Sequence, residues 1–150
     1  MGLIKNDRQL AITRKTLEGL TKVLEKLRAK YRGADYRLTS SGPKGMIEQL
    51  EDEIREYEWL KRATPEQVMK RYPVVKFQDV GPFLARIRIA SGMTQEEIAR
   101  KVGCKQPDIA RLEDADYQSH SARALKSVAE ALGVEIMIGA RKAGRPKRVG

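Results

Sequence analysis

The stretch VGPFLARIRIASGMTQEEIARKVGCKQPDIARLE, residues 80–113, decides the fold of this chain. Thr94 can cap a helix, and Glu97, three residues later, can close the reciprocal hydrogen bonds of a capping box. Gly103 ends that helix and opens a short turn. Pro107 fits only in the first turn of the next helix, where its missing N–H costs little. A capped helix, a glycine turn and a second short helix together predict a helix-turn-helix.

Residues 80–134 resemble the helix-turn-helix family of phage repressors, Cro-like proteins and XRE-type regulators. The resemblance covers roughly a third of the chain and rests on many positions at fixed spacing, which makes it more specific than a short motif. These positions are Arg88, residues 92–99 (GMTQEEIA), Gly103, Gln106, Ile109, Leu112, Glu113 and residues 131–134 (ALGV). The plainer alternative is any pair of amphipathic helices separated by a glycine, but the cap, the turn and the proline position all agree with the motif.

The resemblance implies that the second helix of the motif, residues 105–114, enters the major groove of DNA. Gln106 and Arg111 are then the expected base contacts, because glutamine can pair with adenine and arginine with guanine through two hydrogen bonds. Gln95, first in the preceding helix, is expected to hydrogen-bond a phosphate, as the family position does. With the exposed start of the second helix included, the expected contacts here are Gln95, Lys105, Gln106, Pro107 and Arg111.

Two further residue patterns in this stretch have structural interpretations. By the resemblance, Arg88 is expected to pair with Glu113 and so to tie the first helix of the domain to the third. If that pair is buried, loss of one partner costs about 3–5 kcal/mol. Asp108 is an unusual neighbour for phosphates, and stabilisation of the N-terminal end of its own helix is the preferred interpretation.

The loop after Glu113 lacks the basic residues that compact phage repressors carry there. Ser119 and Ser121 are therefore its expected contacts to phosphate, as neutral donors. Ser121 has an alternative role as the cap of the next helix, which is expected over residues 122–132.

The basic tail, residues 141–150, is expected to be disordered in isolation. Gly144, Arg145 and Pro146 resemble the core of an AT-hook, a minor-groove element in which Arg145 would contact DNA. Ala143 stands where that motif normally has arginine. Non-specific contact of a solvated tail with phosphates is therefore the favoured interpretation.

Residues 7–31 are expected to form one helix, because apolar residues recur at the spacing of a coiled-coil seam. Gly33 and the polar run over residues 39–42 should break it, and a second helix with a similar seam should run from about Pro43 to Arg62. Neither helix can bury its seam alone, so an antiparallel hairpin is the economical arrangement, with pairing to another chain as the alternative. The first helix is mostly basic and the second mostly acidic, although each exposed ion pair contributes less than about 1 kcal/mol.

The connector, residues 63–79, should contain a short helix that starts at Thr64 and ends before Pro73. Residues 134–138 are rich in strand formers. A single strand is not stable alone, so it should pair either with residues 74–77 or with its own copy across a dimer axis. Antitoxin-like members of the family dimerise through such a strand, so the resemblance favours a homodimer, which suits DNA half-sites about 34 Å apart.

Together these patterns predict an all-α chain with four parts. Residues 1–62 form an antiparallel, coiled-coil-like helical hairpin, and residues 63–79 form the connector. Residues 80–140 form a five-helix, repressor-like DNA-binding domain with a short C-terminal strand, and residues 141–150 form the basic tail.

Composition limits the remaining possibilities. The formal charge of +10 and the pI near 9.9 suit a polyanionic partner. Residues 80–140 nevertheless carry eight basic and eight acidic side chains, so the motif rather than the charge indicates DNA binding. The single cysteine, Cys104, excludes a disulfide framework and fits a reducing cytoplasm. No apolar run reaches membrane-span length, and the first residues are not typical of a signal peptide.

Two functions fit the sequence. The first is a sequence-specific DNA-binding repressor in the cytoplasm, at the nucleoid, with the resemblance pointing to the antitoxin of a toxin–antitoxin pair. Its partners would be double-stranded DNA, a second copy of the chain and a toxin protein. The alternative is a protein-interaction module in which the hairpin binds a partner and the helix-turn-helix is only a scaffold. No catalytic constellation, metal site or phosphate-binding loop is present in the sequence, so neither an enzyme nor a cofactor is expected.

Overall fold

The computed structural model describes residues 2–114 and 120–144, and the regular structure of these residues is entirely helical. In chain order the elements are α1 (Asp7–Lys30), α2 (Gly33–Leu60), α3 (Pro65–Arg71), the 3₁₀ helix η1 (Phe77–Asp79), α4 (Val80–Ala90), α5 (Gln95–Val102), α6 (Gln106–Leu112) and α7 (Ala122–Ala131). The predicted all-α class is therefore confirmed. Within the described ranges, every helix is too short or too polar to span a membrane.

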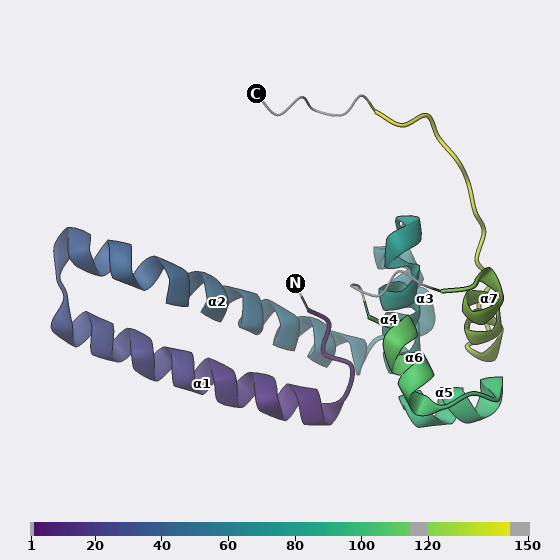
Figure 1. Cartoon of the computed structure of the whole chain (residues 1–150), viewed down its shortest axis with the longest axis horizontal. Coiled ribbons are helices and arrows are strands. Elements are labelled where there is room, and N and C mark those ends of the chain that lie inside the picture. The colour runs from purple at the N-terminus through teal and green to yellow at the C-terminus, as the bar shows by residue number, and fades with distance from the viewer. Residues whose placement is uncertain (1, 115–119, 145–150) are drawn as a thin grey trace.

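The helices α1 and α2 are joined by two residues and run side by side in opposite directions, away from the rest of the molecule (Figure 1). Asn6 caps α1 by accepting a hydrogen bond from the backbone N–H of Gln9 at 2.8 Å. Among the described residues, one ion pair, Arg14–Glu58 at 2.7 Å, joins the two helices directly. At the open end of the hairpin, Asp7 accepts from the Tyr57 hydroxyl at 3.0 Å and pairs with Lys61 at 2.8 Å. The apolar seam of α1 is only partly buried, because a single helix covers it.

The predicted start of the second helix at Pro43 is wrong, because α2 begins at Gly33 and contains that proline. The polar run over residues 39–42 remains helical. The hydroxyl of Thr39, for example, donates to the carbonyl of Asp35 at 2.8 Å, one turn earlier in the same helix. Packing against α1 thus outweighs the weak helix propensity of this run, as tertiary contacts commonly do.

A shared hydrophobic core connects the hairpin to the helices that follow. Its buried members come from the N-terminal segment, α2, the link between α2 and α3, α3 and α4, and they are Ile4, Tyr57, Leu60, Ala63, Val68, Ile87 and Ile89. The predicted connector helix is present as α3, and Thr64 and Gln67 form a capping box at its start. Beside this core, the Glu56 carboxylate accepts hydrogen bonds from the Tyr72 hydroxyl and the Arg86 guanidinium, both at 2.7 Å.

The described part of residues 80–140 contains four α-helices, α4 to α7, instead of the five predicted. Their buried core consists of Val80, Leu84, Ile98, Ala99, Ile109, Leu112, Leu125, Val128 and Ala129. The start of α4 approaches the end of α6 so closely that a Cβ on Gly81 would lie 1.9 Å from the carbonyl oxygen of Leu112. Glycine is therefore required at this position, and the contact holds α6 against α4.

The predicted C-terminal strand is absent, since no described residue between 134 and 140 belongs to a strand. Pairing with residues 74–77, one of the two expected alternatives, is absent as well. Val134 and Ile136 instead pack their side chains against the core, while Met137 and Ile138 are 86% and 79% exposed. Pairing across a dimer axis, the other alternative, requires a second chain. Residues 139–144 lead away from the helices (Figure 1).

Candidate nucleic-acid interface

The helices α5 and α6 form the helix-turn-helix that the sequence predicts. Thr94 accepts a hydrogen bond from the backbone N–H of Glu97 at 3.1 Å, and the Glu97 carboxylate accepts from the backbone N–H of Thr94 at 2.7 Å. These contacts confirm the capping box, and the bonds from Thr94 lower the pKa of Glu97. Gly103 ends α5 with a φ of 81°, in the left-handed region that favours glycine.

Local chemistry also explains the start of α6. Pro107 lies in its first turn, as predicted. The Asp108 carboxylate accepts from the backbone N–H of Lys105 at 3.1 Å and from the Arg111 guanidinium at 2.5 Å, and these hydrogen bonds lower the pKa of Asp108. Asp108 therefore stabilises the N-terminal end of α6, which agrees with the interpretation preferred from the sequence.

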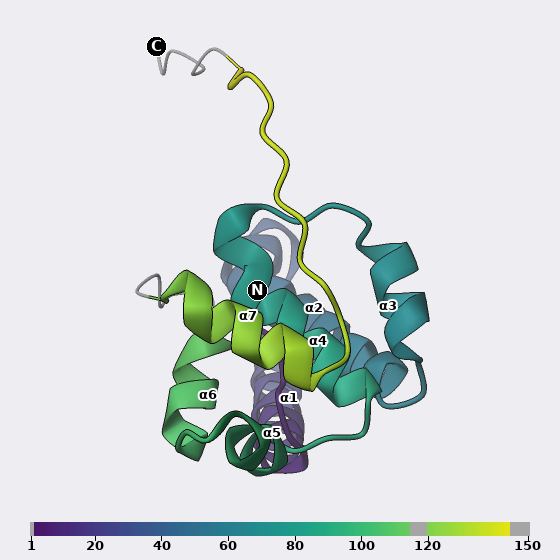
Figure 2. The ribbon, with the colours of Figure 1, turned by 90° about the vertical axis from the view of Figure 1, so that its right-hand side faces the viewer.

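The outer side of α6 is open to solvent. Gln106 and Arg111 are exposed, whereas Ile109 and Leu112 of the same helix are buried. A view along the hairpin places α6 at the edge of the molecule, with the hairpin behind the other helices (Figure 2). In the described part of the chain, the hairpin thus leaves the expected recognition helix uncovered.

A chain of side-chain hydrogen bonds links Gln106 to the interior. Gln106 Nε2 donates to Gln95 Oε1 at 2.7 Å, and Gln95 Nε2 donates to Glu113 Oε2 at 2.7 Å. Glu113 accepts from Arg88 through Nε at 2.5 Å and through Nη2 at 2.9 Å. The side chains of Arg88 and Glu113 are only 4% and 2% exposed, so the expected structural ion pair is present and buried.

The carboxylate of Glu113 fixes the direction of these side-chain hydrogen bonds, because a carboxylate can accept hydrogen bonds but cannot donate them. Gln95 must turn its amide nitrogen toward Glu113, which leaves its carbonyl oxygen for Gln106. Gln106 must then donate one N–H of its own amide. Its second N–H and its carbonyl oxygen are left for a ligand, and adenine offers the matching N7 acceptor and N6 donor in the major groove.

Arg88 makes two further contacts, both to main-chain carbonyl oxygens. Its Nη1 donates to Met93 at 2.7 Å, just before the cap of α5, and its Nη2 donates to Lys5 at 3.1 Å, before α1. The ion pair therefore also fastens the N-terminal segment to the helix-turn-helix. Sequence reasoning missed Lys5, and no residue pattern signals it, because every residue has such a carbonyl group.

The remaining polar groups of Gln95 and Arg111 limit what these residues can offer DNA. Gln95 is 8% exposed, and its bonds to Glu113 and Gln106 leave one N–H for the expected phosphate contact. Arg111 is held by Asp108 on the surface, with side chains 58% and 45% exposed. An exposed ion pair contributes less than about 1 kcal/mol, so a guanine base can readily replace Asp108 as the partner of Arg111.

The structure places the other expected contact residues in different settings. Lys105 and Pro107 are exposed beside Gln106 at the start of α6. Ser121 caps α7 by accepting a hydrogen bond from a backbone N–H of that helix at 3.1 Å, so its alternative role is confirmed. Ser119 and Arg145 lie outside the described residues.

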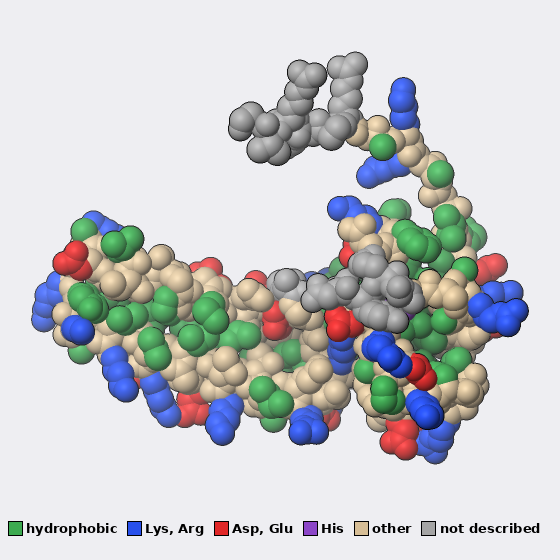
Figure 3. Space-filling model, in the orientation of Figure 1, with side chains coloured by type: hydrophobic (Ala, Val, Ile, Leu, Met, Phe, Trp, Pro, Cys, Tyr) green, Lys and Arg blue, Asp and Glu red, His purple; other side chains and the backbone are tan. Residues whose placement is uncertain are grey.

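Charges of both signs surround this surface. The basic side chains of α5, the turn and α6 are Arg100, Lys101, Lys105 and Arg111, and the acidic ones are Glu96, Glu97 and Asp108. Figure 3 shows basic and acidic side chains close together at this end of the molecule. Recognition here must therefore depend on directed hydrogen bonds more than on a broad positive field.

The comparison with protein families agrees with this geometry. Residues 79–136 match the model of a family described as a helix-turn-helix domain, and the matched range contains α4 to α7 in full. The match supports a DNA-binding regulator of the helix-turn-helix class. Comparisons with curated proteins and with solved structures give no match.

Proposed function

We propose that this protein is a sequence-specific transcriptional repressor that reads the major groove of DNA with α6. The observation that carries the proposal is the hydrogen-bonded chain that presents Gln106 from the buried pair of Arg88 and Glu113. A side chain that is already oriented loses less conformational freedom when it binds, so this arrangement favours selective pairing with one base.

The roles of the individual residues follow from their remaining hydrogen-bonding groups. Gln106 pairs with adenine through its carbonyl oxygen and its second N–H. Arg111 leaves Asp108 and pairs with guanine. Lys105 contacts phosphate near the start of α6, and the N–H that Gln95 has left donates to a phosphate beside it.

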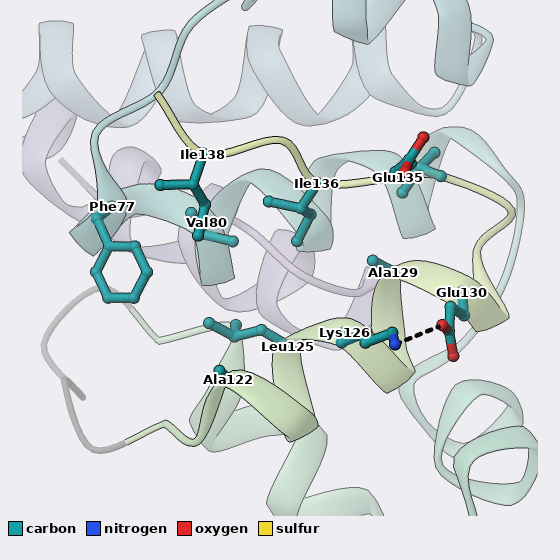
Figure 4. Close-up of a pocket in the computed structure, with 11 residues that line it drawn as sticks. Phe77, Val80, Ala122, Leu125, Lys126, Ala129, Glu130, Glu135, Ile136 and Ile138 are labelled. Atoms are coloured by element: carbon teal, nitrogen blue, oxygen red, sulfur yellow. Dashed lines mark ion pairs between the residues drawn. The ribbon is translucent and has the colours of Figure 1, made fainter. Parts of the chain in front are cut away.

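We further propose that the repressor acts as a homodimer. Residues 134–138 border a pocket of about 520 Å³, which is lined mainly by apolar side chains of η1, α4, α7 and this segment (Figure 4). Phe77 and Ile138 at its rim are 68% and 79% exposed. An extended segment that belongs to no strand in the described structure and carries exposed apolar side chains favours pairing with its own copy. The two copies of α6 would then address half-sites about 34 Å apart.

The proposed biological role is that of an antitoxin in the cytoplasm, at the nucleoid, with a toxin as the protein partner. The resemblance to antitoxin-like regulators supports this role, and the hairpin is the part of the chain available for the partner. In the alternative, the hairpin binds a partner while the helix-turn-helix is only a scaffold. A chain that selects no DNA sequence would favour the alternative.

The test is selection of a preferred sequence from random DNA, followed by gel-shift titration of variants. Replacement of Gln106 by alanine should weaken binding to the selected site by about 5- to 150-fold, because a bidentate base contact contributes about 1–3 kcal/mol of discrimination. Replacement of Arg111 by alanine should have an effect of similar size, at a different base pair.

The matched control is replacement of the exposed Lys70 in α3 by alanine, because α3 and α6 lie on different sides of the molecule (Figure 2). This control removes one positive charge and should leave the preference for the selected site unchanged. Full affinity of a folded Gln106→Ala variant would contradict the assignment of α6 as the reading helix.

A further inference from the structure

The positive charge of the hairpin is concentrated on α1. This helix carries seven basic and three acidic side chains, whereas α2 carries three basic and seven acidic ones. Residues 80–140 carry eight of each sign, so the region of the helix-turn-helix has no excess positive charge of its own. Affinity for DNA depends strongly on basic side chains that neutralise phosphates. Among the helices, α1 therefore has the charge best suited to hold a DNA backbone.

Helix geometry gathers the basic side chains of α1 into one stripe. Successive residues turn by about 100° around a helix, so residues separated by seven or four positions lie close to one direction. Five basic residues of α1 have this spacing and fall within about 80° of one another, while the three acidic residues of the helix fall outside this range. The centre of the apolar seam lies about 150° away, so these side chains are on the side of α1 that is turned away from α2. We call Arg8, Lys15, Lys22, Lys26 and Lys30 the basic stripe.

The side chains of the basic stripe are accessible. All five residues are exposed, and Figure 3 shows basic side chains in a row along the lower edge of the hairpin, which is α1 in Figure 1. Among the residues that the structure describes, Arg8, Lys15 and Lys26 form no ion pair. Lys22 contacts Glu18 at 2.6 Å, but both side chains are 66% exposed, so a phosphate can readily replace Glu18 as the partner.

The basic stripe begins beside the helix-turn-helix. Arg8 follows Lys5 by three residues, and the carbonyl oxygen of Lys5 accepts a hydrogen bond from Arg88 at 3.1 Å. Arg88 in turn holds Glu113, just after the end of α6, at 2.9 Å. Two perpendicular views place α1 and α5 on the same, lower side of the molecule (Figures 1 and 2). One DNA duplex along this side can therefore meet the helix-turn-helix and the outer side of α1 together.

The length of the basic stripe matches the repeat of DNA. At a rise of about 1.5 Å per residue, the stripe extends over about 33 Å. One turn of the double helix is about 34 Å long. The stripe can thus follow the DNA backbone for about one turn beyond the bases that α6 reads.

Two other polyanionic surfaces fit the basic stripe less well. A helix that binds a lipid surface inserts a free apolar side into it, but the apolar seam of α1 packs against α2. An acidic protein would use the charge of α1 alone. DNA would use this charge together with α6, because both helices belong to one rigidly connected junction through Lys5 and Arg88.

We propose that the basic stripe of α1 is a second DNA-contact surface, which binds the phosphate backbone outside the bases that α6 reads. This inference rests on the proposed function for the identity of the ligand. It adds a division of roles, in which α6 selects the sequence and α1 supplies affinity without sequence preference.

The test uses the full chain and the triple variant Lys15→Gln, Lys22→Gln and Lys26→Gln. Gel-shift titrations with the selected site, flanked by at least about one turn of DNA on each side, are repeated between about 50 and 200 mM salt. The slope of log affinity against log salt concentration should become less steep by about 2 to 3, because each phosphate contact contributes about 0.9 to it. Affinity at about 100 mM salt should fall at least about tenfold. The ratio of affinities for selected and random DNA should stay the same, because phosphate contacts carry no sequence information.

The matched control removes the same charge from the other helix of the hairpin. Arg37→Gln, Lys44→Gln and Arg55→Gln replace three exposed basic residues of α2. This variant should change the salt slope by less than about 1. Glutamine is a good helix former and all six positions are exposed, so both variants should keep the parent helicity by circular dichroism.

Three results would overturn the inference. The first is a parent salt slope in the α1 variant, and the second is an equal loss of slope in both variants, because net charge alone would then act. The third is unchanged DNA binding by the α1 variant together with lost binding to vesicles of phosphatidylserine and phosphatidylcholine in equal parts, since the stripe would then bind lipid.

Failure of this inference can be told apart from failure of the proposed function. In each of the three results above, a parent chain that still selects a DNA sequence leaves the proposed function standing. A parent chain that binds DNA without sequence preference, but with the expected difference in slope between the variants, would contradict the proposed function and support the basic stripe.

Discussion

The helix-turn-helix region and the hairpin are both helical, but they are stabilised in different ways. In α4, α5 and α6, side chains such as Leu84, Ile98 and Ile109 are at most 1% exposed and meet in one core. No residue of α1, all of which the structure describes, is buried. Full burial of an aliphatic side chain contributes about 1.5–3 kcal/mol, so the first region has a well-determined shape. The hairpin keeps much of its apolar surface available for another molecule.

This difference suits the two regions to different roles. DNA reading needs side chains at fixed positions, and the buried ion pair of Arg88 and Glu113 supplies that order beneath Gln106. The hairpin instead leaves large apolar side chains such as Val23 and Leu38 exposed, which is typical of an interaction surface. Substitutions in the two regions should therefore differ in size and even in sign.

The largest effect is expected at the buried ion pair. Replacement of Glu113 by alanine leaves the Arg88 guanidinium buried without its carboxylate and should lower the free energy of unfolding by about 3–5 kcal/mol. Urea denaturation followed by circular dichroism measures this change. Replacement of the exposed Glu48 in α2 by alanine should change it by less than about 0.5 kcal/mol.

A second variant shows how much of this loss of stability comes from leaving the Arg88 charge buried without a partner. Replacement of both members of the pair, Arg88→Met with Glu113→Leu, should cost less than Glu113→Ala alone, because no buried charge is left. If Glu113→Ala lowered the free energy of unfolding no more than Glu48→Ala does, the helix-turn-helix region would not be stabilised by this buried ion pair.

The next effect compares two glycines, one from each region. Replacement of Gly81 by alanine forces a Cβ against the carbonyl oxygen of Leu112 and should destabilise the chain by about 1–3 kcal/mol. Replacement of Gly45 by alanine meets open space inside α2 and should stabilise the chain by up to about 1 kcal/mol. Thermal unfolding of the two variants should thus shift in opposite directions. Shifts of the same sign would show that packing at these two sites is alike.

The sequence predicted the helix-turn-helix best because its signals are local. The capping box at Thr94, the left-handed Gly103 and the position of Pro107 each act within one turn of the chain. The start of α2 was predicted wrongly, since residues 39–42 have weak helix propensity and become helical through contact with α1. That contact joins residues far apart in the chain, so local signals cannot report it.

Among the expected DNA-contact residues, too, local features could be predicted and contacts between distant residues could not. Exposure of Gln106 and Arg111 followed from the periodicity of α6, with Ile109 and Leu112 on its buried side. The hydrogen bonds that join Gln95 to Gln106 and Glu113 could not be predicted from this periodicity, because they depend on how separate helices place their side chains. The predicted strand at residues 134–138 rested on composition alone, and composition does not identify a pairing partner.

The smallest effect concerns the junction between the two regions, where Glu56 of α2 accepts hydrogen bonds from Tyr72 and from Arg86 of α4. Burial raises the pKa of Glu56, but the bonds from Arg86 and Tyr72 together outweigh burial, so the pKa lies below its ordinary value of 4.5. A lowered folded-state pKa stabilises the native state above the unfolded pKa, and this contribution is lost as the pH falls through the folded-state value.

Replacement of Glu56 by glutamine, which cannot ionise, should therefore lower the free energy of unfolding at about pH 7, and the gap to the parent chain should narrow at about pH 3. Urea denaturation at both pH values measures the gap. Glu48→Gln is the matched control on the same helix, because Glu48 is exposed and forms no ion pair among the described residues; it should show no gap at either pH. A gap for Glu56→Gln that stays constant with pH would mean that packing, and not this carboxylate, joins the hairpin to α4.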